Sequence, residues 1–220
     1  MSHLRWLVTL STALVPCSGL VDYWNHNSAY HPMIVTIAEE LNGDVLDVGC
    51  GEGLLMERLA GVSRFVTGID RDERAIRQAR VRTAGLTNAT VVQADFMDIE
   101  LAPDSYDLIT FVAVLHHLDL ESALRRSARL LRPGGRLLVV GLSANKSVGD
   151  YARSALLLPV VRLMSGIHRE SGSVGVVAIP PEESFAEIER TARSVLPEIR
   201  LRRALYYRYI LSWAKPVGAR

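Results

Sequence analysis

Three carboxylates and a pair of histidines lie at or near the ends of predicted strands: Asp47, Asp70, Asp95, His116 and His117. A carboxylate can accept hydrogen bonds from the two hydroxyls of a cis-diol or from an amino group. Asp70 follows a glycine turn by about 20 residues, the spacing of the ribose-binding acid in nucleotide-binding folds. An imidazole titrates near neutral pH, so either histidine could take a proton from a hydroxyl or an amine.

A strand, a glycine turn and a helix are predicted in succession around Asp47. Residues 45–48 are apolar except for Asp47, glycines stand at positions 49, 51 and 53, and residues 54–60 have helix composition. Free N–H groups at a helix start, preceded by glycines, form the phosphate-binding turn of dinucleotide sites. Here the spacing is G-x-G-x-G, and Asp47 would repel a pyrophosphate. The turn therefore favours a ligand with a cationic amine.

The remaining elements alternate in a way that predicts a parallel sheet. Further strands are expected at residues 63–69, 90–93, 105–112 and 136–140, with residues 133–135 as the turn into the last of these. Apolar residues at helical spacing predict helices at 33–41, 72–83, 120–131 and 185–196. Residues 199–203 and 206–214 are expected to form two more strands. This alternation gives an α/β fold with right-handed crossovers, whose ligands bind at the carboxyl ends of the strands.

Five segments in this order carry a family resemblance: VLDVGCGEG, GID, QADF, YDLITFVAVLHHL and LLRPGGRLLVV. Together they resemble the class I S-adenosylmethionine-dependent methyltransferases, of the methyltransferase type 11 kind, across roughly residues 44–141. The flanking segments 23–27 and 207–213 are similar to those of small actinobacterial enzymes. The resemblance implies a Rossmann-like three-layer sandwich with strand order 3-2-1-4-5-7-6, mostly parallel, with an antiparallel C-terminal strand.

The resemblance also implies which residues hold S-adenosylmethionine, whose demethylated product is S-adenosylhomocysteine. The carboxylates would bind polar groups, with Asp47 near the amino group or an ordered water, Asp70 on the ribose hydroxyls and Asp95 on the adenine amine. The other contacts would come from glycine backbone and from neighbouring side chains. These are Gly49 and Gly51 at the methionine part, Arg71 and Phe96 at the adenine, and Phe111 and Val112 near the methionine part.

His116 and His117 are the candidates for a general base. The alternative is that one of them only caps or lines the cofactor site, because a His-His-Leu segment occurs in relatives with different acceptors. A neutral amine acceptor would need no strong base. The chain has no N-P-P-Y-like tetrapeptide, which argues against a nucleobase acceptor.

Residues 1–41 are expected to form an N-terminal helical cap. Residues 6–21 carry no charge and resemble a signal-peptide core, but Pro16 precedes Cys17 and no A-x-A-like site is present. We expect a helix that packs on the domain or covers the pocket. The side chains that could contact an acceptor are Tyr23, Trp24, His26, Tyr30 and His31, whose alternative role is packing and solvation of a helix.

Residues 142–183 interrupt the alternation and are expected to form an insertion or lid within one domain of residues 1–220. Connections this long inside a compact domain are usually functional. A surface helix that covers the core and a membrane-interfacial helix are the other interpretations. This segment and the N-terminal one would select the acceptor.

Composition limits the classes of partner. The net charge of +1 gives no large field for nucleic acid, and we read the basic residues 200, 202, 203 and 208 as a solvated strand face rather than an RNA site. Two cysteines do not make a metal set, and their number fits a reducing compartment. No metal, nucleic-acid or membrane partner is expected, and an intracellular cofactor predicts a cytoplasmic location.

The sequence therefore predicts a methyltransferase that acts on an oxygen or nitrogen of a small molecule such as a secondary metabolite. Three alternatives stay open: a protein that binds the cofactor without turnover, an enzyme that uses the sulfonium for other chemistry, and an NAD(P)-dependent oxidoreductase. The G-x-G-x-G spacing and Asp47 argue against the last of these. Neither the acceptor nor the oligomeric state can be read from the sequence.

Overall fold

The computed structural model describes residues 26–146, 180–204 and 208–218. Seven strands form one sheet in the order β3-β2-β1-β4-β5-β7-β6, as the resemblance implied. The first five strands run parallel, and β7 is antiparallel to both β5 and β6. The strands are β1 (Asp44–Val48), β2 (Phe65–Asp70), β3 (Ala89–Gln93), β4 (Tyr106–Val112), β5 (Leu131–Leu142), β6 (Arg200–Arg203) and β7 (Arg208–Ala214).

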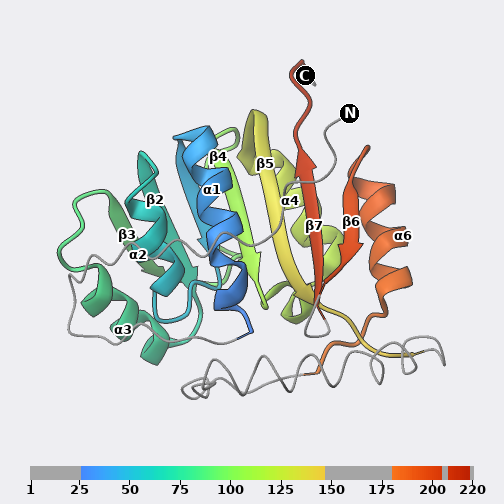
Figure 1. Ribbon diagram of the computed structural model, residues 1–220, viewed down its shortest axis with the longest axis horizontal. Coiled ribbons are helices and arrows are strands. Elements are labelled where there is room, and N and C mark those ends of the chain that lie inside the picture. Colours follow the sequence, from blue (N-terminus) through green and yellow to red (C-terminus); the bar gives the residue numbers. More distant parts are fainter. Residues whose placement is uncertain (1–25, 147–179, 205–207, 219–220) are drawn as a thin grey trace.

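Helices cover both faces of this sheet (Figure 1). One face carries η1 (Ser28–Tyr30), α1 (His31–Leu41), α2 (Leu54–Ala60) and α3 (Glu73–Thr83). The other carries α4 (Leu120–Leu130) and α6 (Phe185–Val195), which contact each other, and the short η2 (Leu115–His117) follows β4. In the view of Figure 1, β2 and β4 point toward the lower edge, so the carboxyl ends of the parallel strands lie there together with η1.

The sheet separates two apolar clusters because alternate side chains of a strand point to opposite faces. Val45 and Leu108 pack against α1 and α2, whereas Leu46 and Ile109 pack toward α4. The central strands β1 and β4 are buried nearly throughout, as expected for parallel strands covered on both sides.

Three helix starts are fixed by side-chain caps. Asp72 accepts hydrogen bonds from the backbone N–H groups of Arg74 and Ala75 at the start of α3. Asp119 accepts from the backbone N–H of Ser122 at the start of α4. Ser184 and Glu187 form a reciprocal capping box at α6. These caps explain why the expected helix boundaries agree with the observed ones to within a few residues.

The residues 133–135 belong to β5 and do not form a turn before it. Tyr106 pairs with Leu131 and Leu108 pairs with Arg136, so the intervening residues bulge out of the ladder between β4 and β5. Gly134 has a φ of 82°, and its N–H donates to the carbonyl of Lys215, while the Lys215 N–H donates to the carbonyl of Gly135. Pairing with the chain after β7 therefore keeps this Pro-Gly-Gly segment within β5 as a bulge.

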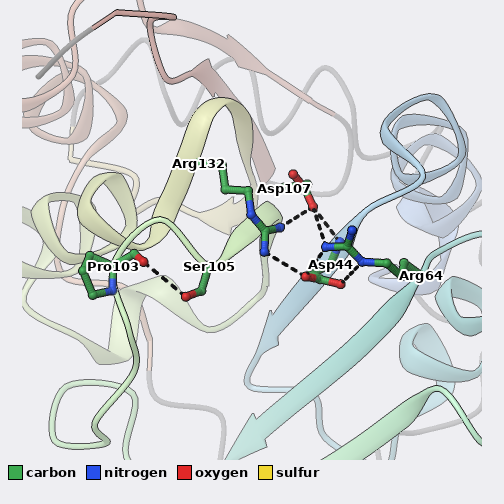
Figure 2. Close-up of polar contacts among 6 residues, drawn as sticks. All are labelled: Asp44, Arg64, Pro103, Ser105, Asp107 and Arg132. Carbon is green, nitrogen blue, oxygen red and sulfur yellow. Dashed lines mark hydrogen bonds and ion pairs between the residues drawn. The ribbon is translucent and has the colours of Figure 1, made fainter.

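Figure 2 shows an ion-pair network where β1 and β4 begin, at the edge opposite the carboxyl ends. Arg132 reaches both Asp107 (2.5 Å) and Asp44 (2.9 Å), and Arg64 also pairs with Asp44. The Asp44 N–H donates to Asp107 at 2.8 Å. Hydrogen bonds from Arg64 and Arg132 hold the pKa of Asp44 below its usual value, although burial opposes them.

Several expectations lie outside the described residues. Tyr23, Trp24, Cys17 and most of the expected lid at residues 142–183 are among them. Within the described part of the chain, no helix is long and apolar enough to cross a membrane. Cys50 is buried, and burial together with the nearby Asp47 and Asp70 raises the pKa of its thiol.

Candidate active site at the carboxyl edge of the sheet

The glycine turn joins β1 to α2 at the carboxyl edge. Gly49, Gly51 and Gly53 have φ angles of 70°, 55° and 82°, which other residues adopt only with strain. The N–H groups of Gly49 and Cys50 both donate to the carbonyl of Ile69 at the end of β2, at 2.7 and 3.0 Å. A Cβ at Gly49 would overlap Val114, but one at Gly51 would meet no atom within 4 Å. The space in front of Gly51 is therefore open to a ligand.

Asp70 ends β2 with both carboxylate oxygens oriented by backbone N–H groups. Its Oδ2 accepts from Gly51 at 2.9 Å, and its Oδ1 accepts from Asp72 at 2.9 Å. Each oxygen keeps further acceptor capacity, because a carboxylate has about four lone-pair sites. The predicted ribose-binding acid is thus fixed directly beside the glycine turn.

Asp95 and Arg71 come together from the ends of neighbouring strands. Arg71 follows β2 and Asp95 follows β3, and the guanidinium Nη1 lies 3.6 Å from Asp95 Oδ2. Asp95 Oδ1 accepts from the Met97 N–H at 2.8 Å. The structure therefore brings together two of the three residues that were assigned to the adenine, Arg71 and Asp95, with the Asp95 carboxylate oriented by its own turn.

Asp47 is a buried carboxyl group in β1, with 2% of its surface exposed. Thr110, its partner in register on β4, donates a hydrogen bond from Oγ1 to Asp47 Oδ1 at 2.8 Å. Burial and the nearby Asp70 raise the pKa of Asp47 to about 7, against the lowering effect of the Thr110 hydrogen bond. The chain thus holds an acid at the glycine turn that can exchange its proton near neutral pH.

Phe96 and Phe111 lie within the apolar cluster on the α4 face. Phe96 is 3% exposed, and its ring meets that of Phe111 edge to face with 5.3 Å between centroids. The Arg126 guanidinium lies over the Phe96 ring at 5.3 Å. Contact between Phe96 and an adenine would require the ring to leave this packing. Val112, at the end of β4, is half-buried on the opposite face.

His116 and His117 form η2, directly after β4, with ring centroids 4.0 Å apart. Ala113 has a φ of 57°, which is rare for a residue other than glycine, and this sharp turn places Val114 over Gly49. Burial and the charge of Arg71 lower the pKa of His117, so its imidazole is neutral at pH 7. The imidazole pair therefore lies beside the groups assigned to the cofactor.

Of the N-terminal residues predicted to contact an acceptor, His31 is buried, whereas Tyr30 and His26 are half-buried. His31 is the first residue of α1 and is buried, and its Nδ1 lies 3.0 Å from the Arg58 guanidinium on α2. Burial and the Arg58 charge lower the pKa of His31 to about 3. It is therefore neutral at physiological pH and is too weak a base to take a proton from an acceptor. Tyr30 and His26 are half-buried near the same helix start.

A shallow hollow of about 440 Å³ lies on the α4 side, and Arg126, which lies over the Phe96 ring, is part of its lining. It is lined by residues 98–102, Arg126 and Arg129, from the loop after β3 and from α4. None of the predicted site residues lines it, and its charges of both signs show no selectivity. No group of His, Cys, Asp or Glu side chains in the described ranges is arranged to hold a metal ion.

Two residues with a role at this edge were not predicted. Thr110 appeared in sequence only as one of several strand residues, and its alignment with Asp47 follows from the β1–β4 register. Arg58 appeared in sequence only as part of the predicted helix at residues 54–60, and the packing of α1 on α2 brings it to His31. Local sequence carries no signal for either contact, because both cross between elements.

Comparison with known proteins agrees with this geometry. Residues 46–139 match the model of a methyltransferase domain. The chain is 33% identical over 199 residues to an uncharacterised methyltransferase of Mycobacterium bovis, which covers 88% of this chain and 98% of that protein. It is also 33% identical over 138 residues to a ubiquinone biosynthesis O-methyltransferase of Thiobacillus denitrificans, with 56% of this chain and 59% of that protein covered.

Among solved structures, an S-adenosylmethionine-dependent methyltransferase of Methanosarcina mazei superposes with a TM-score of 0.60. The match covers 84% of this chain and 98% of that one at 19% identity, so it establishes the shared fold. The structure has the glycine turn, an acid at the end of β2 and one after β3, and the sheet order of this fold. The Mycobacterium bovis relative is matched over 98% of its own length. The chain belongs to the class I S-adenosylmethionine-dependent methyltransferases.

Proposed function

We propose that this methyltransferase binds S-adenosylmethionine at the carboxyl edge and transfers its methyl group to an oxygen or nitrogen of a small-molecule acceptor. The observation that carries the proposal is the convergence of Asp47, Gly51, Asp70 and Asp95 at the ends of three adjacent parallel strands. Ligands of open α/β sheets bind at this edge.

The residues at this edge fit the chemistry of the cofactor. Asp70 and Asp95 are partly exposed carboxylates already oriented by backbone N–H groups, as acceptors for ribose hydroxyls and an adenine amine. The open space at Gly51 allows a ligand to approach the backbone closely. Asp47 supplies an acid for the amino group of the methionine part. When bound, the cofactor supplies a methyl group activated by a positive sulfur.

Transfer from a sulfonium is an in-line displacement, so the chain contributes mainly by holding the reactants in line and excluding water. Val114 lies against Gly49 of the glycine turn, and η2 follows Val114 in the chain. In this proposal His117, neutral at pH 7, removes the proton from an acceptor hydroxyl. An acceptor amine that is already neutral would need only orientation.

The choice of an oxygen acceptor has support from one set of relatives. The chain matches ubiquinone biosynthesis O-methyltransferases over about half its length. A phenolic hydroxyl is therefore the acceptor that we would try first. The intracellular origin of the cofactor supports a cytoplasmic place of action in this proposal.

Two measurements test the proposed function. Calorimetry with S-adenosylhomocysteine on the folded protein should show one binding site. Radiolabelled methyl transfer to panels of phenols, other alcohols, amines and thiols should then give product with an oxygen or nitrogen acceptor. Binding without transfer to any panel member would favour a non-catalytic cofactor-binding protein. No binding of S-adenosylhomocysteine by protein with a cooperative melt would contradict the proposal.

A further inference from the structure

The Thr110 hydroxyl lies between two acceptors in the middle of the sheet. Its Oγ1 is 2.8 Å from Asp47 Oδ1 and 3.4 Å from the carbonyl oxygen of Leu46, and Thr110 is fully buried. A hydroxyl has one proton to donate and two lone pairs that accept. It can donate to the Asp47 carboxylate, or it can donate to the Leu46 carbonyl while it accepts from a protonated Asp47. Thr110 thus has a partner for either protonation state of Asp47.

Among the residues that the structure describes, no cation lies close enough to Asp47 to compensate its charge. The Asp70 carboxylate from β2 and the Cys50 thiol from the glycine turn are the titratable groups that interact with it. Above this face, His31 of α1 is neutral and Arg58 of α2 is hydrogen-bonded to it. Among the described residues, Asp47 is in no ion pair. An isolated buried carboxylate is costly, and its protonated form is favoured.

Other charged groups on this face have partners elsewhere. Glu57 of α2 pairs with Arg82 of α3, and Glu40, at the far end of α1, pairs with Arg136. Burial, rather than any of these charges, is the largest cause of the raised pKa of Asp47, and the Asp70 charge adds to it. A cation delivered by a ligand would therefore be the first opposite charge that Asp47 meets.

We propose that Thr110 is a positioning residue that sets the proton affinity of Asp47, and that the ammonium group of the ligand displaces the Asp47 proton on binding. The inference rests on the proposed function, which makes that ammonium the amino group of S-adenosylmethionine or S-adenosylhomocysteine. The O–H bond of the Asp47 carboxyl breaks, the proton leaves to solvent, and the carboxylate pairs with the ammonium. Cofactor binding is then coupled to pH.

Proton release and affinity follow from this coupling. Below about pH 7, where Asp47 is largely protonated, binding should release up to one proton, and affinity should fall by about tenfold for each further pH unit. The ligand ammonium stays protonated in this range, because α-amino groups titrate at about 7.7 or above. Asp47→Asn cannot release a proton, so its affinity should be lower and independent of pH.

Thr110→Val should shift the pH midpoint of cofactor affinity while leaving the packing around Asp47 nearly unchanged. Valine has nearly the same shape but cannot donate to Asp47, so the pKa of Asp47 should rise. The loss of affinity should then begin at higher pH than in the wild type. Thr110→Ser keeps the donor and should restore the wild-type profile. A purely structural role of Thr110 would change the melting temperature but leave the pH midpoint of the affinity profile where it is in the wild type.

The experiment is calorimetry with S-adenosylhomocysteine between pH 5.5 and 7.5, in paired buffers with different ionisation enthalpies. The difference in heat between the buffers gives the number of protons released. 5′-Methylthioadenosine, which keeps the nucleoside but lacks the ammonium, is the matched control ligand. We expect near one proton released with S-adenosylhomocysteine at pH 6 and none with the control. The midpoint of the affinity profile should be shifted upward in Thr110→Val.

The outcomes separate the two proposals. If folded wild-type protein binds neither ligand, the proposed function fails. Binding of S-adenosylhomocysteine without proton release overturns the inference and leaves the function standing. An affinity profile whose pH midpoint is unchanged in Thr110→Val overturns the role of Thr110. If Asp47→Asn does not fold, the wild-type proton count and the valine and serine variants decide the matter.

Discussion

The Gly51 N–H donates a 2.9 Å hydrogen bond to Asp70 Oδ2, which links the glycine turn after β1 to the acid at the end of β2. The two residues are 19 positions apart and meet because β1 and β2 are paired in parallel, with Val48 opposite Ile69. The hydrogen bond holds the turn open in front of Gly51 and orients the carboxylate. The position of the Asp70 carboxylate therefore depends on the conformation of the glycine turn.

Replacing Asp70 with Asn should weaken S-adenosylhomocysteine binding by at least tenfold. An amide can accept at only one side, so either the Gly51 or the Asp72 hydrogen bond is lost, at about 1–3 kcal/mol for a charged acceptor. Calorimetry measures the change. Asp104→Asn is the matched control, because Asp104 is exposed and lies just before the first residue of β4, at the edge of the sheet away from Asp70. Equal affinity in both variants would contradict the assignment of Asp70.

Alanine at Gly51 should affect binding more than stability, whereas alanine at Gly49 should do the reverse. A Cβ at Gly51 meets no protein atom, so the cost is the left-handed backbone, about 1–2 kcal/mol. The methyl group would nevertheless occupy the space offered to the ligand. A Cβ at Gly49 overlaps Val114 and should lower the melting temperature much further. Urea denaturation and calorimetry on both variants distinguish these effects, and similar binding by Gly51→Ala and wild type would count against a ligand at this turn.

The sheet and the position of the three acids at its carboxyl edge could be predicted because their signals are local. Strand periodicity, glycine spacing and the acids after each strand stand in short segments, and the parallel arrangement brings the strand ends to one edge. The strand order itself came from the family resemblance. Residues 133–135 were expected to form a turn before the strand, but they belong to β5 as a bulge, because they pair with Lys215, 80 residues after Gly135.

The roles of individual side chains were harder to predict, since they depend on packing between elements. His31 and Phe96 have residue types that suit a site, yet both are buried. Thr110 has an ordinary strand residue type, yet its hydroxyl contacts the buried acid. Residue type indicates what a side chain could do, and the cross-strand register and helix packing decide whether it faces a ligand.

The amino-edge network should contribute to stability without affecting cofactor binding. Asp107 accepts from Arg132 and from the Asp44 N–H, so Asp107→Asn leaves two arginines facing one carboxylate. We expect a loss of about 1–3 kcal/mol in the free energy of unfolding, measured by urea denaturation. The affinity for S-adenosylhomocysteine should stay within about twofold, because the network lies at the opposite edge of the sheet (Figure 2). A large loss of affinity would show that the two edges are coupled.

His31 should make the protein less stable in acid. Its pKa is lowered from 6.5 to about 3 in the folded state, so below pH 6.5 the unfolded chain binds a proton that the native one does not. Stability from this group is complete above pH 6.5 and is lost as pH falls toward 3, by about 2 kcal/mol between pH 6.5 and 5. Asp47, with its raised pKa, acts in the opposite direction over part of this range.

The difference between wild type and His31→Gln isolates the histidine, because Asp47 contributes equally to both. Glutamine keeps an acceptor for Arg58 but does not titrate. Urea denaturation should show that the variant loses less stability than the wild type between pH 7 and 5. The difference between the two proteins at pH 7 reports packing alone. Parallel pH profiles would mean that His31 can be protonated without cost in the folded state.

His117→Gln should lower kcat by about a hundredfold with a hydroxyl acceptor, the usual contribution of a general base. Its Nδ1 is buried and accepts no hydrogen bond from the described residues, and its lowered pKa keeps it unprotonated at pH 7. His116→Gln, at the neighbouring ring, is the matched control and should retain most activity. The affinity for S-adenosylhomocysteine should change little in either variant. The wild-type kcat at saturating cofactor should persist below pH 6.5, because the pKa of His117 is lowered. A larger loss in His116→Gln would transfer the role to that residue.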